Sequence, residues 1–311
     1  MRFLEKVDRE AISELLGRDE YFWLDLCDPG EEEARALGEL LSFHPLALED
    51  MLKRGQRPKL DDFGDYMFLV YYGAADGADG EIELEEVHAF LSGGYLVTSH
   101  QHPCPALEEA RQRFSAQAPR SEQFVVYRVL DGLTDTFFPV LEDLGDRMER
   151  LDGEIFERTE PGQLEEITRL RRRLVELRRV VGPQRDLLAR GIDDILEIPG
   201  LQADSRTYFR DVYDHSIRIS DQIDSYRDLL AGTRDAYLSL VSNRLNQITK
   251  QLTVVATVFL PLSFIVGFFG QNFGWMVINI RSEADFWVFG VGGLVVSVLA
   301  LVAWFRRASY L

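Results

Sequence analysis

The chain is poor in cysteine and in positive charge, and each shortage excludes a class of protein. Cys27 and Cys104 are the only cysteines among 311 residues, too few for a disulfide framework or a four-cysteine zinc site. We therefore expect both to be reduced thiols. Acidic residues outnumber Lys and Arg by 52 to 34, which gives a net charge of −18. A protein that binds nucleic acid needs surplus positive charge, so we expect no nucleic-acid partner.

Catalytic signatures are also missing. The sequence has no P-loop (GxxxxGK[ST]), no Gly-rich phosphate loop and no triad spacing, so we expect neither an enzyme nor an organic cofactor. His100 and His102 with Cys104 are a weak zinc signal, and a structural role is favoured for them. An arginine-rich stretch, 169–179, suggests an anion site, but a solvated helix face paired with acidic neighbours is favoured. The charged first ten residues argue against a signal peptide.

Long apolar runs occur only near the C-terminus. Leu252–Phe269 and Phe286–Phe305 carry no charge, and each is long enough to cross about 30 Å of hydrocarbon as a helix. Trp287 and Trp304 lie near the ends of the second run, where aromatic residues meet the membrane–water interface. A buried soluble core is disfavoured for two such runs, so the sequence predicts an integral protein of the lipid bilayer.

The basic residues beside these runs predict the orientation. Lys250 precedes the first run, Arg306 and Arg307 follow the second, and the loop between the runs has Arg281 as its one basic residue. Because positive charge is retained on the cytoplasmic side, we expect both termini in the cytoplasm and the loop outside. The protein is then a multi-pass component of the plasma or inner membrane.

The part before the membrane divides by pattern into two regions. Residues 1–120 have β-branched and aromatic runs of strand type, alternating with helix signals. A helix start is expected where Asp28-Pro29 precedes acidic residues. The expected strands are Tyr21–Leu26, Tyr66–Tyr72, Ile82–Leu91 and Tyr95–Ser99, and Gly93-Gly94 joins the last two as a hairpin. The fold class is therefore an α+β domain, a mixed sheet flanked by helices.

Helical periodicity follows from residue 121 to 251. We expect a long hairpin, with one arm from Ser121 to Arg158 and the other from Leu164 to Ala189. A stalk helix then runs from Asp204 into the membrane, about 95 Å long at 1.5 Å per residue. Its apolar stripe predicts packing against other copies or against the hairpin. The third region is 252–311, with spans 252–269 and 286–305, an outer loop 270–285 and a tail 306–311.

A polar stripe follows one face of the first span. It consists of Asn246, Thr249, Thr253, Thr257 and Ser263. Two interpretations stay open for it: helix packing through small hydroxyl residues, or a water-filled path faced by several subunits. The spans contain no Asp, Glu or His, which does not favour a site that strips an ion of its water.

The sequence resembles the CorA magnesium-transporter family. The segment Ser242–Phe273 reads SNRLNQITKQLTVVATVFLPLSFIVGFFGQNF and is similar to the first span and pore motif of that family. Agreement continues at WLDLCDP, HPLALEDMLKRGQRPK and YFRDVYDH. The resemblance covers essentially the whole chain. It implies a homopentamer whose first span lines a central pore, with a cytosolic funnel and long stalk helices.

The resemblance also implies roles for individual residues. The family motif Gly-Met-Asn corresponds to Gly270-Gln271-Asn272, so Asn272 is the expected selectivity residue and Gln271 departs from the pattern. A ring of carboxamides suits hydrated Mg²⁺, which loses its water reluctantly. Further pore positions are the polar Asn246 and Ser263, with Leu252 and Leu260 as hydrophobic constrictions.

Acidic positions of the family bind a regulatory divalent cation between subunits. They correspond here to Asp50, with Glu49 beside it, and to Asp211. Asp235 is expected to add an acidic ring at the inner mouth of the pore, and His215 lies next to the regulatory position. Ordinary surface acids are the alternative for Asp50 and Asp211.

These expectations define a leading function and two alternatives. The leading function is passive influx of hydrated Mg²⁺, with Co²⁺ or Ni²⁺ as further cargo, through a homopentameric pore that intracellular divalent cations close. Mg²⁺ is then both transported and regulatory. A ZntB-like Zn²⁺ transporter, with or without proton coupling, is the alternative favoured by Gln271. The alternative of another class is a membrane-anchored oligomeric scaffold or sensor that conducts nothing.

Overall fold

Six strands form one mixed sheet in the N-terminal part of the chain. In the computed structural model, β1 (Arg2–Leu4), β2 (Phe22–Cys27) and β6 (Tyr95–His100) run parallel, and β5 (Ile82–Leu91), β4 (Met67–Asp76) and β3 (Lys59–Asp62) continue the sheet antiparallel. The spatial order is β1-β2-β6-β5-β4-β3. The structure describes residues 1–77, 81–116, 119, 121–198, 206–271, 273–280 and 282–307.

The four expected strands are confirmed within two residues, except that β4 extends to Asp76. The hairpin at Gly93-Gly94 is confirmed by the antiparallel pairing of β5 with β6. The sequence did not predict β1 and β3, which have three and four residues. The α+β class with a mixed sheet is therefore confirmed.

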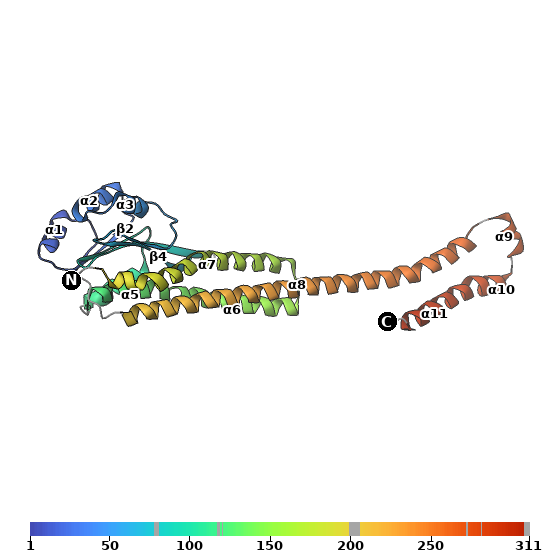
Figure 1. Cartoon of the computed structure of the whole chain (residues 1–311). Coiled ribbons are helices and arrows are strands. Elements are labelled where there is room, and N and C mark those ends of the chain that lie inside the picture. Colours follow the sequence, from blue (N-terminus) through green and yellow to red (C-terminus); the bar gives the residue numbers. More distant parts are fainter. Residues whose placement is uncertain are drawn as a thin grey trace. The chain divides into compact units, whose positions relative to one another are not determined.

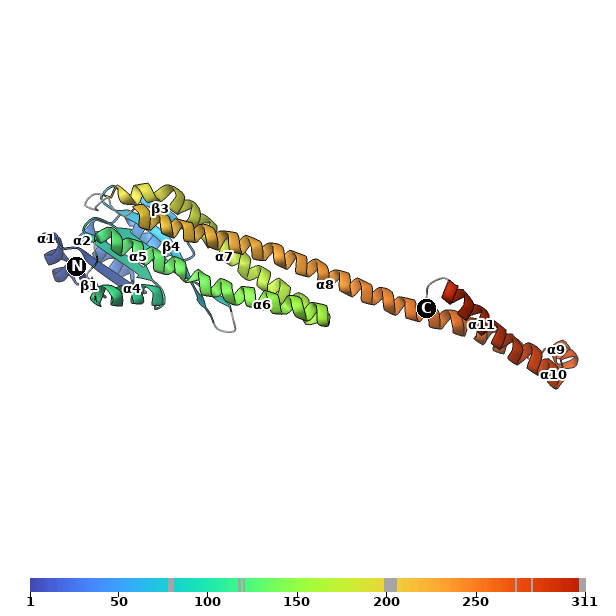
Figure 2. The ribbon, with the colours of Figure 1, turned by 90° about the horizontal axis from the view of Figure 1, so that it is seen from below.

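Helices cover both faces of the sheet. In Figure 1, α1 (Arg9–Gly17), α2 (Glu31–Leu41) and α3 (Pro45–Leu52) lie on one face. The other face carries α5 (Glu122–Asp135), α7 (Pro161–Leu196) and the first part of α8 (Arg206–Phe269), with α4 (Pro105–Ala116) beside α5 (Figure 2). The buried core under this second face includes Trp23, Tyr71 and Phe209.

The expected first arm of the hairpin is two helices instead of one. α5 ends at Asp135 and α6 (Phe137–Glu157) begins directly after Thr136. The hydroxyl of Thr136 accepts a hydrogen bond from Ala74 N in β4, at 2.8 Å, and donates to Leu133 O at 2.6 Å. A side chain that bonds the sheet and its own preceding turn interrupts the helix at this point.

The chain forms two compact units, Met1–Arg234 and Asp235–Leu311. The second contains the remainder of α8, then α9 (Gly274–Asn279), α10 (Glu283–Asp285), a π-helical turn η2 (Phe286–Val291) and α11 (Gly292–Arg307). α8 and the segment Glu283–Arg307 are long and apolar enough to cross a membrane. Pro261 lies inside α8 and has no N–H to donate to the carbonyl four residues earlier.

Candidate functional site

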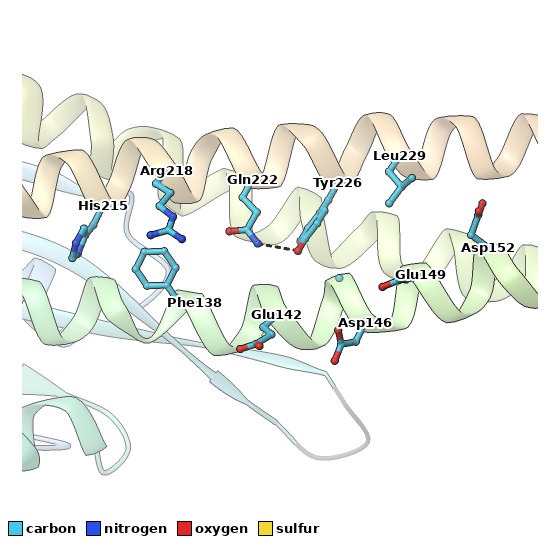
Figure 3. A pocket seen from close by; sticks show the side chains of 11 residues that line it. Phe138, Glu142, Asp146, Glu149, Asp152, His215, Arg218, Gln222, Tyr226 and Leu229 are labelled. Carbon is cyan, nitrogen blue, oxygen red and sulfur yellow. Dashed lines mark hydrogen bonds between the residues drawn. The ribbon is translucent and has the colours of Figure 1, made fainter.

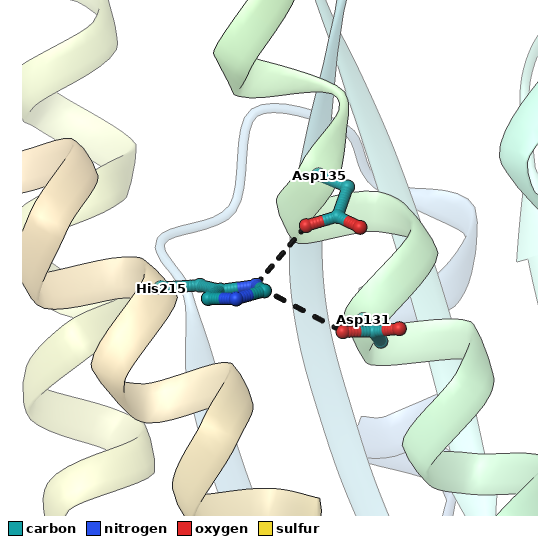
Figure 4. A group of neighbouring side chains, drawn as sticks. All are labelled: Asp131, Asp135 and His215. Carbon is teal, nitrogen blue, oxygen red and sulfur yellow. Dashed lines mark hydrogen bonds and ion pairs between the residues drawn. The ribbon is translucent and has the colours of Figure 1, made fainter.

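Two carboxylates and an imidazole meet where α5 ends beside α8. Asp131 and Asp135 are one turn apart in α5, and His215 comes from the first turns of α8 (Figure 4). His215 Nδ1 is 3.1 Å from Asp135 Oδ1 and 3.9 Å from Asp131 Oδ1. One ligand atom from each residue lies within 4.8 Å of the other two. The cluster can therefore hold a cation.

A third acid, from α8, lies at the same place. Asp211 Oδ1 is 3.9 Å from His215 Nε2, and its side chain is 55% exposed. Carboxylate oxygens are the ligands that Mg²⁺ prefers, whereas the imidazole also suits Zn²⁺, Co²⁺ and Ni²⁺. Asp211, which the resemblance predicts as a regulatory ligand, and His215 beside it are thus joined by Asp131 and Asp135, which the sequence did not single out.

Asp131 is the buried member of this cluster, with 8% of its side chain exposed. Burial raises the pKa of its carboxyl to about 6, and repulsion by Asp135 adds to the effect while His215 opposes it. Arg128 Nη1 lies 2.8 Å from the second carboxylate oxygen and favours the ionised form. The raised pKa shows that burial and the neighbouring carboxylates outweigh this pairing, so the ionised cluster is electrostatically unfavourable when no cation is present.

An acidic groove extends from His215 between α6 and α8, with a volume of about 800 Å³ (Figure 3). The α6 wall carries four acids, Glu142, Asp146, Glu149 and Asp152. On the other wall, Gln222 Nε2 donates to Tyr226 Oη at 2.8 Å. A Cβ at Gly145 would lie 2.4 Å from this hydroxyl, so glycine at this position leaves room for the Tyr226 side chain.

Asp50 and Glu49 are paired within the same chain. Lys59 Nζ lies 2.7 Å from Asp50 Oδ2, and Lys53 binds Glu49. The cation cluster at His215 does not include either acid. Among the described residues, the contacts of one chain therefore do not join Asp50 to Asp211.

The expected pore positions form no interior within one chain. Asn246, Thr249, Thr253 and Ser263 are exposed, and Leu252 and Leu260 have exposed fractions of 68% and 71%. Thr257 is half-buried, and Asp235 is exposed. Thr253 Oγ1 donates to Thr249 O at 2.8 Å, the back-bonding that helix packing through hydroxyls predicts. Such a hydroxyl still offers its oxygen to water.

The Gly-Gln-Asn motif begins at the C-terminal end of α8. Gly270 N donates to Val266 O at 2.9 Å and Gln271 N to Phe268 O at 3.3 Å. These two bonds satisfy carbonyls at the end of the helix. Asn272 lies outside the described residues.

The weak zinc signal resolves into separate hydrogen bonds. His100 Nε2 contacts Asp25 Oδ1 at 3.2 Å, and Cys104 Sγ donates to Glu85 Oε2 at 3.2 Å. These partners support the favoured structural role. The arginine stretch needs one correction: Arg169 pairs with Glu166 at the surface as expected, but Arg173 is 2% exposed and not on a solvated face.

An α+β unit with an acidic cluster that can hold a cation, followed by two helices apolar enough to cross a membrane, is the arrangement expected of a membrane protein that handles metal cations. Comparison with known proteins agrees with this class. The sequence pattern of the CorA-like Mg²⁺ transporter protein family matches residues 18–307. The cobalt/magnesium transport protein CorA of Thermotoga maritima is 34% identical over 282 residues, 88% of this chain and 79% of that protein. The chain belongs to the CorA-like Mg²⁺ transporter family.

Two further relatives extend the comparison. The zinc transport protein ZntB of Yersinia pseudotuberculosis is 25% identical over 295 residues, 93% of this chain and 88% of that protein. The solved structure of the CorA magnesium transporter of Methanocaldococcus jannaschii has the same fold, with a TM-score of 0.80 at 24% identity. It covers 93% of this chain, and the match spans 91% of that structure.

Proposed function

We propose that this chain is the subunit of a homopentameric channel through which hydrated Mg²⁺ enters the cell. Family membership and the T. maritima relative, whose name gives cobalt and magnesium as cargo, support the choice of ion. An inside-negative potential supplies about 4.6 kcal/mol per 100 mV for a divalent cation. Influx therefore needs no nucleotide hydrolysis, and we assign no enzymatic activity to the chain.

The spacing of small and polar residues along α8 is the observation that carries the proposal. Two positions repeat every seven residues: Asn246, Thr253, Leu260 and Gly267, and also Thr249, Ala256, Ser263 and Gly270. A seven-residue repeat keeps one seam facing identical neighbours in a parallel bundle. α8 is a continuous helix to Phe269, so this seam extends through the whole first span. Small and hydroxyl side chains along it leave room for water.

Leu260 is the one large apolar residue of the seam, so it is the strongest candidate for a constriction that closes by dewetting. Leu252 and Thr257 lie beside the seam in this register. Replacing Leu260 with serine should raise Mg²⁺ flux in the closed condition. Leu262→Ser, which is outside the seam, is the matched control. Unchanged flux in Leu260→Ser would contradict the constriction.

Selectivity is assigned to the carboxamide side chains that follow the seam, which the five subunits arrange as a ring. By position in the family motif, Asn272 binds the hydrated ion, with Gln271 beside it. Carboxamide oxygens accept hydrogen bonds from the water shell that Mg²⁺ retains. The Asp235 ring concentrates cations at the inner mouth by charge alone.

Regulation is assigned to carboxylates at the boundary between subunits. Asp50 and Glu49 of one subunit would share a divalent cation with Asp211 of its neighbour. The cluster of Asp131, Asp135 and His215 lies beside Asp211 and adds ligands to the same site. Without a cation these acids repel one another, which favours separation of the subunits. Internal Mg²⁺ removes the repulsion and closes the pore.

The test is Mg²⁺ influx into liposomes that contain the purified protein, combined with mass measurement of the detergent-solubilised particle. We expect a pentamer, with voltage-driven influx that high Mg²⁺ on the cytosolic side stops. Asp50→Ala together with Asp211→Ala should remain open at high Mg²⁺. Glu39→Ala, an exposed acid of α2, is the control. A monomer, or a double variant that still closes, contradicts the proposal.

The same assay separates the alternatives. Gln271 in place of methionine, together with the ZntB relative, keeps Zn²⁺ as a second candidate cargo. Zn²⁺ uptake that excess Mg²⁺ does not reduce would favour it, and a dependence on a proton gradient would add coupling. A scaffold predicts no divalent flux at all and no effect of Asn272→Ala.

The orientation is part of the proposal. We place both termini in the cytoplasm and the protein in the plasma or inner membrane. The reason is that Lys250, Arg306 and Arg307 flank the spans at the ends that lead to the termini, and basic residues are retained on the cytoplasmic side. The regulatory acids then face internal Mg²⁺, as negative feedback requires.

A further inference from the structure

Lys59 lies between two carboxylates in the α+β unit. Its Nζ is 2.7 Å from Asp50 Oδ2 and 2.5 Å from Asp61 Oδ2. Gln56 Nε2 donates to the other oxygen of Asp50, at 3.4 Å. Both oxygens of Asp50 therefore have partners before any divalent cation arrives. The Lys59 and Asp50 side chains keep 32% and 27% exposure, so the pair is shielded but open to exchange.

The fold fixes the ammonium group in this position. Lys59 begins β3 and pairs in register with Val70 of β4, and its ammonium is 5.3 Å from the centre of the Phe68 ring. A lysine is protonated at neutral pH, so these contacts hold a positive charge directly beside the Asp50 carboxylate.

We propose that Lys59 is a built-in competitor of the regulatory divalent cation. It holds the Asp50 carboxylate while the intersubunit site is empty and releases it when the cation binds. The inference rests on the proposed role of Asp50. Asp61 lets this exchange proceed, because Lys59 keeps one carboxylate partner after it gives up the other. Lys59 thereby sets the Mg²⁺ concentration at which the channel closes.

Removing the competitor should tighten the site. Lys59→Met keeps an unbranched side chain on Phe68 but removes the ammonium group. A divalent cation then displaces no positive charge from Asp50, and no ammonium group repels the bound cation. We expect the Mg²⁺ concentration for half-maximal response to fall about three- to tenfold. Asp61→Asn acts in the opposite direction, because Lys59 then has Asp50 as its remaining carboxylate partner, and the concentration should rise.

The experiment is a Mg²⁺ titration of the full-length protein in detergent. Binding is measured by calorimetry and by the rise of the thermal unfolding midpoint. Closure of flux in liposomes is the functional counterpart. Arg9→Met removes one positive charge from the same unit, where Arg9 pairs with Glu39 at 2.7 Å, and should leave the titration unchanged. Lys59→Arg retains the charge and should stay close to the wild type.

Failure of the inference and failure of the proposed function give different results. If Asp50→Ala leaves the Mg²⁺ titration as in the wild type, the regulatory role of Asp50 is wrong. If Asp50→Ala shifts the titration but Lys59→Met leaves it unchanged or raises the concentration, the competitor role is wrong. In an Asp50→Ala background, Lys59→Met should have no further effect. Should Lys59→Met not fold, a lower concentration in Asp61→Asn would equally overturn the inference.

Discussion

Replacing Asp131 with asparagine should stabilise the protein in the absence of divalent cations and weaken its response to Mg²⁺. The pKa of Asp131 rises from 3.8 to about 6, so its ionised form costs the folded state about 3 kcal/mol at pH 7. This cost already contains the effect of the neighbouring charges, but the neutral asparagine accepts a weaker hydrogen bond from Arg128, which removes part of the gain. We expect a net gain of about 1–2 kcal/mol, or about 2–8 °C in the unfolding midpoint.

The gain should depend on pH in a defined direction. Because the pKa of this acid is raised on folding, its ionisation destabilises the folded protein progressively as the pH rises from about 4 to about 6. At pH 5 the cost of ionised Asp131 is about half its value at pH 7, so the advantage of Asp131→Asn should shrink accordingly. With Mg²⁺ present the order should reverse in favour of the wild type, because the cation needs the carboxylate.

The assay is thermal unfolding of the detergent-solubilised full chain at pH 7 and pH 5, in EDTA and in Mg²⁺. Asp214→Asn removes the same charge from an exposed position of α8 and serves as the control. An Asp131→Asn midpoint below that of the wild type in EDTA at pH 7 would refute the unfavourable charge. An equal Mg²⁺-dependent rise in both proteins would refute the role of Asp131 as a ligand.

Two further predictions concern stability. Gly145→Ala should destabilise the first unit by about 1–3 kcal/mol, because the new Cβ meets the Tyr226 hydroxyl. Gly153→Ala is the control: it has open space around it and should be neutral or stabilising. Thermal unfolding of the two variants distinguishes these outcomes. Burial lowers the pKa of His100, but the hydrogen bond and charge of Asp25 outweigh it and raise that pKa. The protonated pair therefore stabilises the fold below about pH 6.5 and loses this contribution as the pH rises. Asp25→Asn should lower the thermal unfolding midpoint more at pH 6 than at pH 8. Equal decreases at the two pH values would contradict the pairing of His100 with Asp25.

The parts of the fold that the sequence predicted are those with a strong repeating pattern. β5 was predicted with its exact bounds, because apolar and acidic residues alternate at its start, its end is apolar, and a Gly-Gly turn follows. The start of α2 was placed two residues early, since Gly30 and not Asp28 is its N-cap. β3 has the sequence Lys-Leu-Asp-Asp, and four mostly polar residues give no alternation to read.

The cation cluster shows why a site is harder to predict than a fold. Asp131 and Asp135 are four residues apart on a helix, a spacing that ordinary surface acids share. Their neighbour His215 is 80 residues later than Asp135 in the chain, and only the packing of α5 against α8 brings them together. The paired state of Asp50 was equally hidden, because it depends on where β3 begins.

Pro261 has a mechanical consequence for the first span. The carbonyl of Thr257 lacks the intrahelical partner that every residue except proline would supply four positions later. Bending α8 at this level breaks no backbone bond that was present, so the span can flex there at lower energetic cost than elsewhere in lipid. Pro261→Ala would restore the donor and stiffen the helix. We expect slower opening after Mg²⁺ is withdrawn, measured as the lag before influx into liposomes.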